Sequence, residues 1–232
     1  MEICSKCKGN GFILFRDDKG REIARPCECR ERMIAENRLK ASGISEAAFQ
    51  EKTFESFNTK DNEILSSAKS KAMDYADNFE KIESETRNSA LFIGQVGCGK
   101  THLSMAIANK LLKEKNVGVV YMPYRETMTL LKQLAMDDKY KCEEEMHRLI
   151  NARVLVIDDL FKGSTTEADI NYMFQIINAR YLNNKPFICS SEKSHHDLLK
   201  IDEAIASRLI EQAKGHTVWF KEDMKLNYRI YG

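Results

Sequence analysis

The fold of this chain is decided by one stretch, which reads Gly94-Gln95-Val96-Gly97-Cys98-Gly99-Lys100-Thr101. It fits the pattern G-x-x-x-x-G-K-[ST] of phosphate-binding loops and lies between a short apolar run and a helical pattern, as such a loop does. Its glycines allow the backbone to wrap a phosphate group with the N–H groups pointing inward. We therefore predict that residues 94–101, together with His102, bind a nucleoside triphosphate.

Two side chains of this loop have predicted roles of their own. Lys100 is expected to reach the β- and γ-phosphates, and the Thr101 hydroxyl is expected to ligate Mg²⁺. The helix that begins near Lys100 points its positive end at the same place. A purely structural glycine-rich turn is the alternative, and the flanking strand and helix argue against it.

A second apolar strand, residues 154–157, ends in Asp158 and Asp159. Beyond a phosphate-binding loop, this arrangement has the form of a Walker B element. We expect Asp158 to hold Mg²⁺, usually through water, and Asp159 to orient or deprotonate the attacking water. Most hydrolytic ATPases carry Glu at the second position, and Asp is one methylene shorter. Slow hydrolysis is therefore expected.

Strands and helices alternate through the second half of the chain. Strands are predicted over residues 90–93, 117–122, 154–157, 186–190 and 217–220, with helices between them, including one helical region over 195–213. An amphipathic helix is predicted before them, over residues 61–83. This alternation predicts an α/β fold with a parallel sheet covered by helices on both faces, and ligands bind such sheets at the carboxyl ends of the strands. The phosphate-binding loop, Asp158-Asp159 and Ser190-Ser191-Glu192 would converge there.

Four of the seven cysteines lie before residue 30, as Cys4-x-x-Cys7 and Cys27-x-Cys29. Two short strand patterns with a polar turn between them predict a hairpin that brings the pairs together, which is how four-thiolate zinc sites are usually built. So short a segment has almost no core, and zinc would hold it folded. Unrelated free thiols and a redox role for the first pair are the alternatives, and the paired spacing favours zinc.

The composition excludes several classes of protein. The chain has 232 residues, 43% hydrophobic and 31% charged, with a net charge of +1. Any nucleic-acid binding therefore requires a local basic patch. No apolar run approaches the length of a membrane span, and the polar N-terminus is not a signal peptide. We expect a cytoplasmic protein with no membrane partner.

Together these motifs resemble a known family. The two nucleotide motifs, the triplet Ser190-Ser191-Glu192 and the run Ala204-Ile205-Ala206-Ser207-Arg208-Leu209 are similar to those of AAA+ ATPases. More narrowly, the chain resembles bacterial and phage helicase loaders of the DnaC/DnaI type and the related IstB transposition ATPases. The cysteine cluster favours a loader, because IstB proteins generally lack one. The resemblance covers nearly the whole chain and implies a P-loop NTPase (AAA+) sheet with a short or absent helical lid.

The resemblance also implies bound groups, partners and domains. ATP, Mg²⁺ and Zn²⁺ would be bound, and Mg-dependent ATP hydrolysis would be slow and stimulated by partners. The partners would be a replicative helicase, single-stranded DNA, and further copies of the chain through the ATP sites. The implied domains are a zinc-binding module (1–40), a linker and helix (41–88) and an AAA+ ATPase domain (89–232).

Individual site residues follow from the resemblance as well. Arg208 would be the arginine finger, which reaches the γ-phosphate of a neighbouring subunit and stabilises the charge on the transferring phosphoryl oxygens. The sensor position, normally Asn, falls on Glu192, which cannot donate a hydrogen bond when ionised. Either Ser190 or Ser191 takes that role, or hydrolysis is weakened. Arg229, in a Tyr-Arg pair near the C-terminus, would face the nucleotide.

Three questions stay open from the sequence. The basic residues of the helices after the second strand could follow DNA phosphates or form a mixed solvated face; they are Arg125, Lys132, Lys139, Lys141 and Arg148. The aromatic segment 53–57 could wall the base-binding pocket or pack as a linker. The leading function is an ATP-controlled helicase loader. A transposition helper acting on duplex DNA is the runner-up, and a small-molecule kinase is the third possibility.

Overall fold

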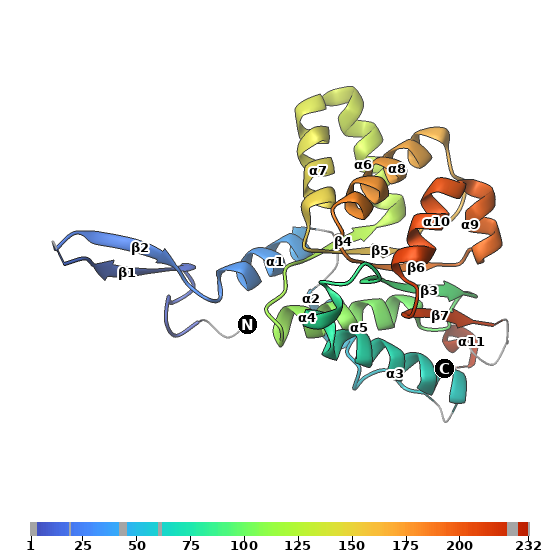
Figure 1. The fold of residues 1–232 in the computed structure, drawn as a ribbon, viewed down its shortest axis with the longest axis horizontal. Coiled ribbons are helices and arrows are strands. Elements are labelled where there is room, and N and C mark those ends of the chain that lie inside the picture. The colour runs from blue at the N-terminus through green and yellow to red at the C-terminus, as the bar shows by residue number, and fades with distance from the viewer. Residues whose placement is uncertain (1–3, 19, 42–45, 60–61, 222–226, 232) are drawn as a thin grey trace.

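The computed structural model of the protein describes residues 4–18, 20–41, 46–59, 62–221 and 227–231. Its centre is a five-stranded parallel sheet (Figure 1). The strands, in spatial order, are β4 (Val119–Pro123), β5 (Val154–Asp158), β6 (Phe187–Ser191), β3 (Ala90–Gly94) and β7 (Thr217–Phe220). The strand that leads into the phosphate-binding loop therefore lies inside the sheet, between β6 and β7.

Each inner strand is apolar along its length because both of its faces are buried. Side chains alternate between the two faces of a strand. Ala90 and Phe92 of β3 belong to one hydrophobic cluster, whereas Leu91 and Ile93 belong to another. The sheet thus separates two cores, and a shift of β3 by one residue would exchange them.

Helices cover both faces of the sheet (Figure 1). One core contains residues of α3 (Glu63–Asp77), α4 (Phe79–Ile82) and α5 (Lys100–Lys113). The other contains residues of α6 (Tyr124–Asp137), α7 (Lys139–Asn151), α8 (Glu167–Leu182), α9 (His195–Ile201) and α10 (Glu203–Gln212). The predicted parallel sheet with helices on both faces is confirmed. No helix in the part of the chain that the structure describes is long and apolar enough to cross a bilayer.

The predicted helix boundaries are wrong in two places, each time at a polar residue that caps a helix. The region 195–213 is two helices, because Asp202 has an extended backbone and its carboxylate accepts a hydrogen bond from Ile205 N. The helix predicted over 61–83 is likewise divided, since Asn78 lies between the end of α3 at Asp77 and the start of α4 at Phe79. Short polar caps interrupt a helix without disturbing the apolar periodicity on which the predictions rest.

The segment before β3 packs into the main core. Phe54, Phe57 and five α3 side chains share a buried cluster with α5 and the sheet. Two short helices flank this part of the chain in the sequence. Helix α2 (Glu46–Glu51) precedes Phe54, and α11 (Tyr228–Tyr231) follows β7. The predicted division at residues 40 and 88 stays a prediction, but α3 clearly packs as part of the nucleotide-binding body.

The N-terminal residues form the predicted hairpin, with β1 (Phe12–Arg16) antiparallel to β2 (Glu22–Pro26). The hairpin extends away from the sheet (Figure 1). The helix that follows, α1 (Arg30–Ala41), packs beside β4 and α5. Asn116, in the turn between α5 and β4, donates a hydrogen bond from its side-chain amide to Glu28 O at 3.1 Å. The module thus meets the body at the amino end of β4.

Candidate functional site

The phosphate-binding loop connects β3 to α5, and its glycines are required by its backbone. Gly97 has φ +79° and Gly99 has φ +92°, in the left-handed region that favours glycine. A Cβ at Gly99 would lie 2.6 Å from Cε2 of Phe57. The Lys100 ammonium donates hydrogen bonds to Gly94 O at 2.8 Å and Gln95 O at 2.6 Å. The loop is therefore held in a tight curve around the Lys100 side chain.

The Asp158 carboxylate lies behind this loop and accepts hydrogen bonds from three hydroxyl groups. Thr101 Oγ1 and Ser190 Oγ donate to Oδ1, at 2.8 and 2.5 Å, and Tyr121 Oη donates to Oδ2 at 2.7 Å. The three donors come from α5, β6 and β4, so Asp158 connects a helix and two strands. The residue is only 8% exposed, and these contacts satisfy a buried carboxylate.

Asp159 stands at the turn after β5 and points to a different neighbour. Its backbone is left-handed, with φ +56°, and its N–H donates to Ser190 Oγ at 2.9 Å. Its carboxylate pairs with Lys162 Nζ at 2.7 Å, and the same ammonium pairs with Glu192 at 3.0 Å. The hydrogen bond from Asp159 raises the pKa of Lys162 above its ordinary value, with a further contribution from Glu192. Lys162 therefore carries a full positive charge between two acids.

These groups surround one cavity of about 490 Å³. Its lining includes Lys100 and Thr101 from the start of α5, and Asp159, Lys162 and Glu192 from the segments that follow β5 and β6. Phe57, His102 and Tyr228 supply aromatic walls, with the Phe57 ring edge-on to His102 at 5.2 Å. A cavity of this size, with apolar walls and a few converging charged groups, is typical of a small-molecule site.

The segment 53–57 packs against the body and also reaches the cavity, and contact of Phe57 with a nucleotide base stays a prediction. Phe57 lines the cavity, whereas Phe54 is buried in the core. His102, on the first turn of α5, holds this segment in place, since its Nε2 lies 2.9 Å from Thr53 O and 3.3 Å from Ser56 Oγ. The linker is thus attached directly to the helix that follows the phosphate-binding loop.

The pair Thr101–Asp158 fits a magnesium ion. Mg²⁺ prefers oxygen ligands and keeps several waters. The Thr101 hydroxyl lines the cavity, and the carboxylate behind it is within hydrogen-bond distance of that hydroxyl. A carboxylate has about four lone-pair sites, so Asp158 retains acceptor capacity for a metal-bound water besides its three hydroxyl donors.

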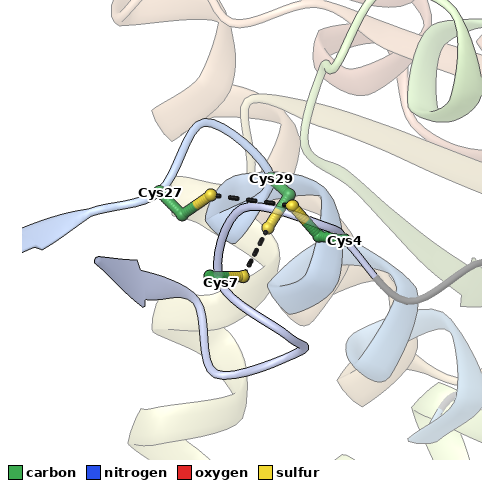
Figure 2. Close-up of side chains that lie close together, drawn as sticks. All are labelled: Cys4, Cys7, Cys27 and Cys29. Carbon is green, nitrogen blue, oxygen red and sulfur yellow. Dashed lines mark hydrogen bonds between the residues drawn. The ribbon is translucent and has the colours of Figure 1, made fainter. Parts of the chain in front are cut away.

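The four N-terminal cysteines come together at the base of the hairpin (Figure 2). All four sulfur atoms lie within 4.8 Å of one another. Cys4 Sγ is 3.8 Å from Cys27 Sγ, and Cys7 Sγ is 3.4 Å from Cys29 Sγ. A zinc ion with Zn–S bonds of about 2.3 Å separates its thiolates by about 3.8 Å in a tetrahedron. The thiol set therefore fits zinc in number, chemistry and spacing.

Backbone groups around the cluster favour thiolates. The N–H of Gly11 donates to Cys7 Sγ at 3.3 Å. Backbone N–H groups of Cys7 and Lys6 lower the pKa of the Cys4 thiol to about 6. Met33 and Ile13 pack against the cluster and are its main apolar cover. With so little core, the hairpin depends on the cluster for its attachment.

Of the two arginines with predicted roles, the structure describes the side chain of Arg208, which makes its contacts outside the cavity. Arg208, on α10, packs its guanidinium over the rings of Phe174 and Tyr181 and donates to Ala204 O at 2.7 Å. Its predicted action concerns the γ-phosphate of another subunit and stays a prediction. The Arg229 side chain lies outside the described residues, so its predicted contact with nucleotide stays a prediction too.

The basic residues proposed for DNA are mostly engaged within the chain. Lys132 pairs with Asp169 at 2.8 Å, and Arg148 makes two hydrogen bonds to Glu145, at 2.7 and 2.6 Å. Weaker pairs join Lys139 to Glu143 and Lys141 to Asp138 on α7. These pairs favour the mixed solvated face over a continuous basic track.

Sequence reasoning missed two members of the site, Tyr121 and Lys162. Tyr121 lies inside a buried strand, where an aromatic residue is an ordinary core choice, and only the hydrogen bond from its hydroxyl to Asp158 of the neighbouring strand reveals a function. Lys162 lies in a polar turn three residues after Asp159, and a lysine close to the Walker B carboxylates was the one signal that could have identified it.

Comparison with known proteins places the chain in a family. The model of the bacterial DnaA ATPase domain matches residues 50–214. The phage-like element PBSX protein XkdC of Bacillus subtilis is 34% identical over 236 residues, covering 99% of this chain and 86% of XkdC. An insertion sequence IS5376 putative ATP-binding protein of Geobacillus stearothermophilus is 25% identical over 138 residues, covering 59% of this chain and 53% of that protein.

Solved structures share the fold. A DnaC helicase loader superposes with a TM-score of 0.59 at 23% identity, covering 75% of this chain and 99% of that chain. The replication initiator DnaA bound to AMPPCP and single-stranded DNA gives a TM-score of 0.61 at 24% identity, covering 78% and 53%. The chain therefore belongs to the family of the bacterial DnaA ATPase domain and has the AAA+ form of the P-loop NTPase fold.

Proposed function

We propose that the chain binds ATP with Mg²⁺ in the cavity beside the phosphate-binding loop and hydrolyses it slowly. The observation that carries this proposal is the convergence of Lys100, the Thr101–Asp158 hydrogen bond and Asp159 around one cavity. Phosphate, metal and attacking water each have a suitable group there. The bound magnesium would neutralise charge developing on the phosphoryl oxygens.

Each residue of the candidate site has one role in this proposal. Lys100 and the loop N–H groups hold the phosphates, while Thr101 and Asp158 hold the metal, the aspartate through water. Asp159 orients the attacking water. Its carboxylate is paired with Lys162. Phe57 and Tyr228 wall the part of the cavity where the base would stack.

We further propose that the protein loads a replicative helicase onto single-stranded DNA. Support comes from the thiol cluster in front of the ATPase domain, from the fold shared with a DnaC helicase loader, and from the DnaA neighbour solved with single-stranded DNA. The cysteine module would bind the helicase, the ATPase domain would bind DNA, and ATP bound between copies would control assembly through Arg208.

Nucleotide binding is tested first, with Lys100→Ala. The variant removes the positive charge from the loop, and we expect its affinity for a fluorescent ATP analogue to fall more than about a hundredfold, the loss of two charge-assisted bonds. Lys113→Ala, on the last turn of the same helix, is the control and should bind normally. Retained affinity in Lys100→Ala would overturn the assignment of the loop.

Helicase loading is tested by co-purification. The wild type, immobilised with ATP, is expected to retain the replicative helicase of the host and to prefer single-stranded over duplex DNA. Cys27→Ser should lose the helicase and keep ATP binding, because the module lies apart from the nucleotide cavity. A chain that binds no helicase and prefers duplex DNA would end the loader proposal.

That second outcome would favour the alternative, a transposition helper ATPase. One observation supports it, the similarity to the IS5376 ATP-binding protein over 59% of the chain. In this alternative, the present chain would assemble on duplex DNA with a transposase. Co-purification of a transposase with the chain on duplex DNA would support it and contradict the loader.

A further inference from the structure

Lys162 is a positive charge held between two acids at the wall of the nucleotide cavity. Its ammonium contacts Asp159 and Glu192, at 2.7 and 3.0 Å, and all three side chains line the cavity. The three charges sum to −1 in a cavity that Lys100 and the phosphate-binding loop also line. A bound triphosphate would bring further negative charge to this cavity, and Lys162 is the positive group beside the two carboxylates that could attract it.

The turn that carries Lys162 is fixed, whereas its side chain is not. Asp159 and Phe161 have left-handed backbones, and Phe161 is buried. Ser190 Oγ accepts from Asp159 N, and Ser191 Oγ donates to Leu160 O at 2.8 Å. The Lys162 side chain is 32% exposed and ends in a flexible four-carbon stem. Its charge can therefore change partners while the backbone stays in place.

We propose that Lys162 is the group that distinguishes a nucleoside triphosphate from a diphosphate in this site. When the terminal phosphate is present, the ammonium moves from the two carboxylates to the phosphate oxygens. Asp159 is thereby released to accept a hydrogen bond from the attacking water. The inference rests on the proposed binding of ATP and adds a positioning residue to it.

Glu192 has an active part in this arrangement. Glu192 directly follows β6, and its carboxylate cannot donate a hydrogen bond to a phosphate but competes with the phosphate for Lys162. Because the pair is 24–32% exposed, its strength is modest and a doubly charged phosphate can displace it. Removal of Glu192's charge should therefore strengthen triphosphate binding, the opposite effect to removal of Lys162's charge.

The experiment measures the affinities of AMPPCP and ADP, each with Mg²⁺, by calorimetry on the full chain. In Lys162→Met we expect AMPPCP to bind about tenfold more weakly, the loss of one bond to a charged group, with ADP affinity unchanged. Lys162→Arg should retain most of the discrimination. Glu192→Gln should bind AMPPCP more tightly relative to ADP. Lys193→Met, one residue after Glu192, is the matched control and should equal the wild type.

Two results overturn the inference. If Lys162→Met weakens both nucleotides equally, or lowers only the melting temperature, Lys162 is a structural ion pair and does not contact the terminal phosphate. If Glu192→Gln leaves the AMPPCP-to-ADP ratio unchanged, there is no competition for the ammonium. Failure of the wild type to bind either nucleotide would instead contradict the proposed function itself.

Discussion

Ser190→Ala is the change that examines the carboxylate arrangement most directly. The Ser190 hydroxyl donates to Asp158 Oδ1 at 2.5 Å and accepts from Asp159 N at 2.9 Å, so one buried group connects the two aspartates of the Walker B strand. Alanine fits the same space and removes both hydrogen bonds. It leaves the phosphate-binding loop unaltered in sequence and changes one side chain of β6.

The expected loss of stability follows from these two bonds. Thr101 and Tyr121 still donate to Asp158, so the loss of the Ser190 bond leaves the carboxylate partly satisfied. We therefore take the low end of the usual contribution of a hydrogen bond to a charged acceptor, about 1.5 kcal/mol. The Asp159 N–H is left without its acceptor in a largely buried place, at about 1.5 kcal/mol. We therefore expect the free energy of unfolding to fall by about 3 kcal/mol.

Urea unfolding of Ser190→Ala and Ser191→Ala tests this reasoning. Ser191 is equally buried, but its hydroxyl donates to the neutral Leu160 O and accepts from Lys193 N, which water can reach. Its loss should therefore be about 1 kcal/mol. Only Ser190→Ala should also weaken Mg²⁺-dependent nucleotide binding. Equal losses in the two variants would refute the idea that Ser190 organises the carboxylates.

Three further predictions concern the module, the interface between copies and the response to pH. Metal analysis of the purified protein should find about one zinc per chain, and none in Cys27→Ser; a metal-free wild type would return the cysteines to free thiols. Arg208→Ala should bind ATP normally but lose the hydrolysis that depends on assembly. Phosphate release measures the hydrolysis and light scattering measures the assembly; unchanged turnover would exclude the role of Arg208 as an arginine finger. Burial lowers the pKa of His216 below its ordinary 6.5, so the unfolded chain takes up a proton that the folded chain does not. Stability should therefore fall as the pH drops below 6.5, and less so in His216→Gln, when urea unfolding at pH 7.5 and 5.5 is compared.

The sequence predicted the parts of the fold that local pattern determines. Short apolar runs that end in glycine or aspartate and alternate with helical patterns favour buried strands of a parallel sheet, and the order of strands and helices then leaves few topologies. The phosphate-binding loop and Asp158-Asp159 are contiguous motifs. They were therefore visible without knowledge of what lies opposite them.

Contacts between distant segments could not be predicted in this way. Tyr121 meets Asp158 across neighbouring strands, and Phe57 meets Gly99 from a segment that has no regular pattern. Lys162 reaches Glu192 only because the turn after β5 is left-handed, and a single sequence does not specify that conformation at a non-glycine residue. Each contact depends on side-chain packing, which periodicity does not encode.

Helix α5 links the two candidate sites, since it begins at the nucleotide cavity and ends beside the cysteine cluster. Its first residue, Lys100, lines the nucleotide cavity, and its last, Lys113, lines a hollow beside Cys4, Cys27 and Cys29. Its 14 residues span about 21 Å at about 1.5 Å per residue. A tilt of about 5° at the phosphate end would move the far end by roughly 2 Å over that length. Helix α5 therefore connects the two candidate sites, and a displacement that a bound nucleotide caused at its first turn would be carried to the thiol cluster beside its last turn.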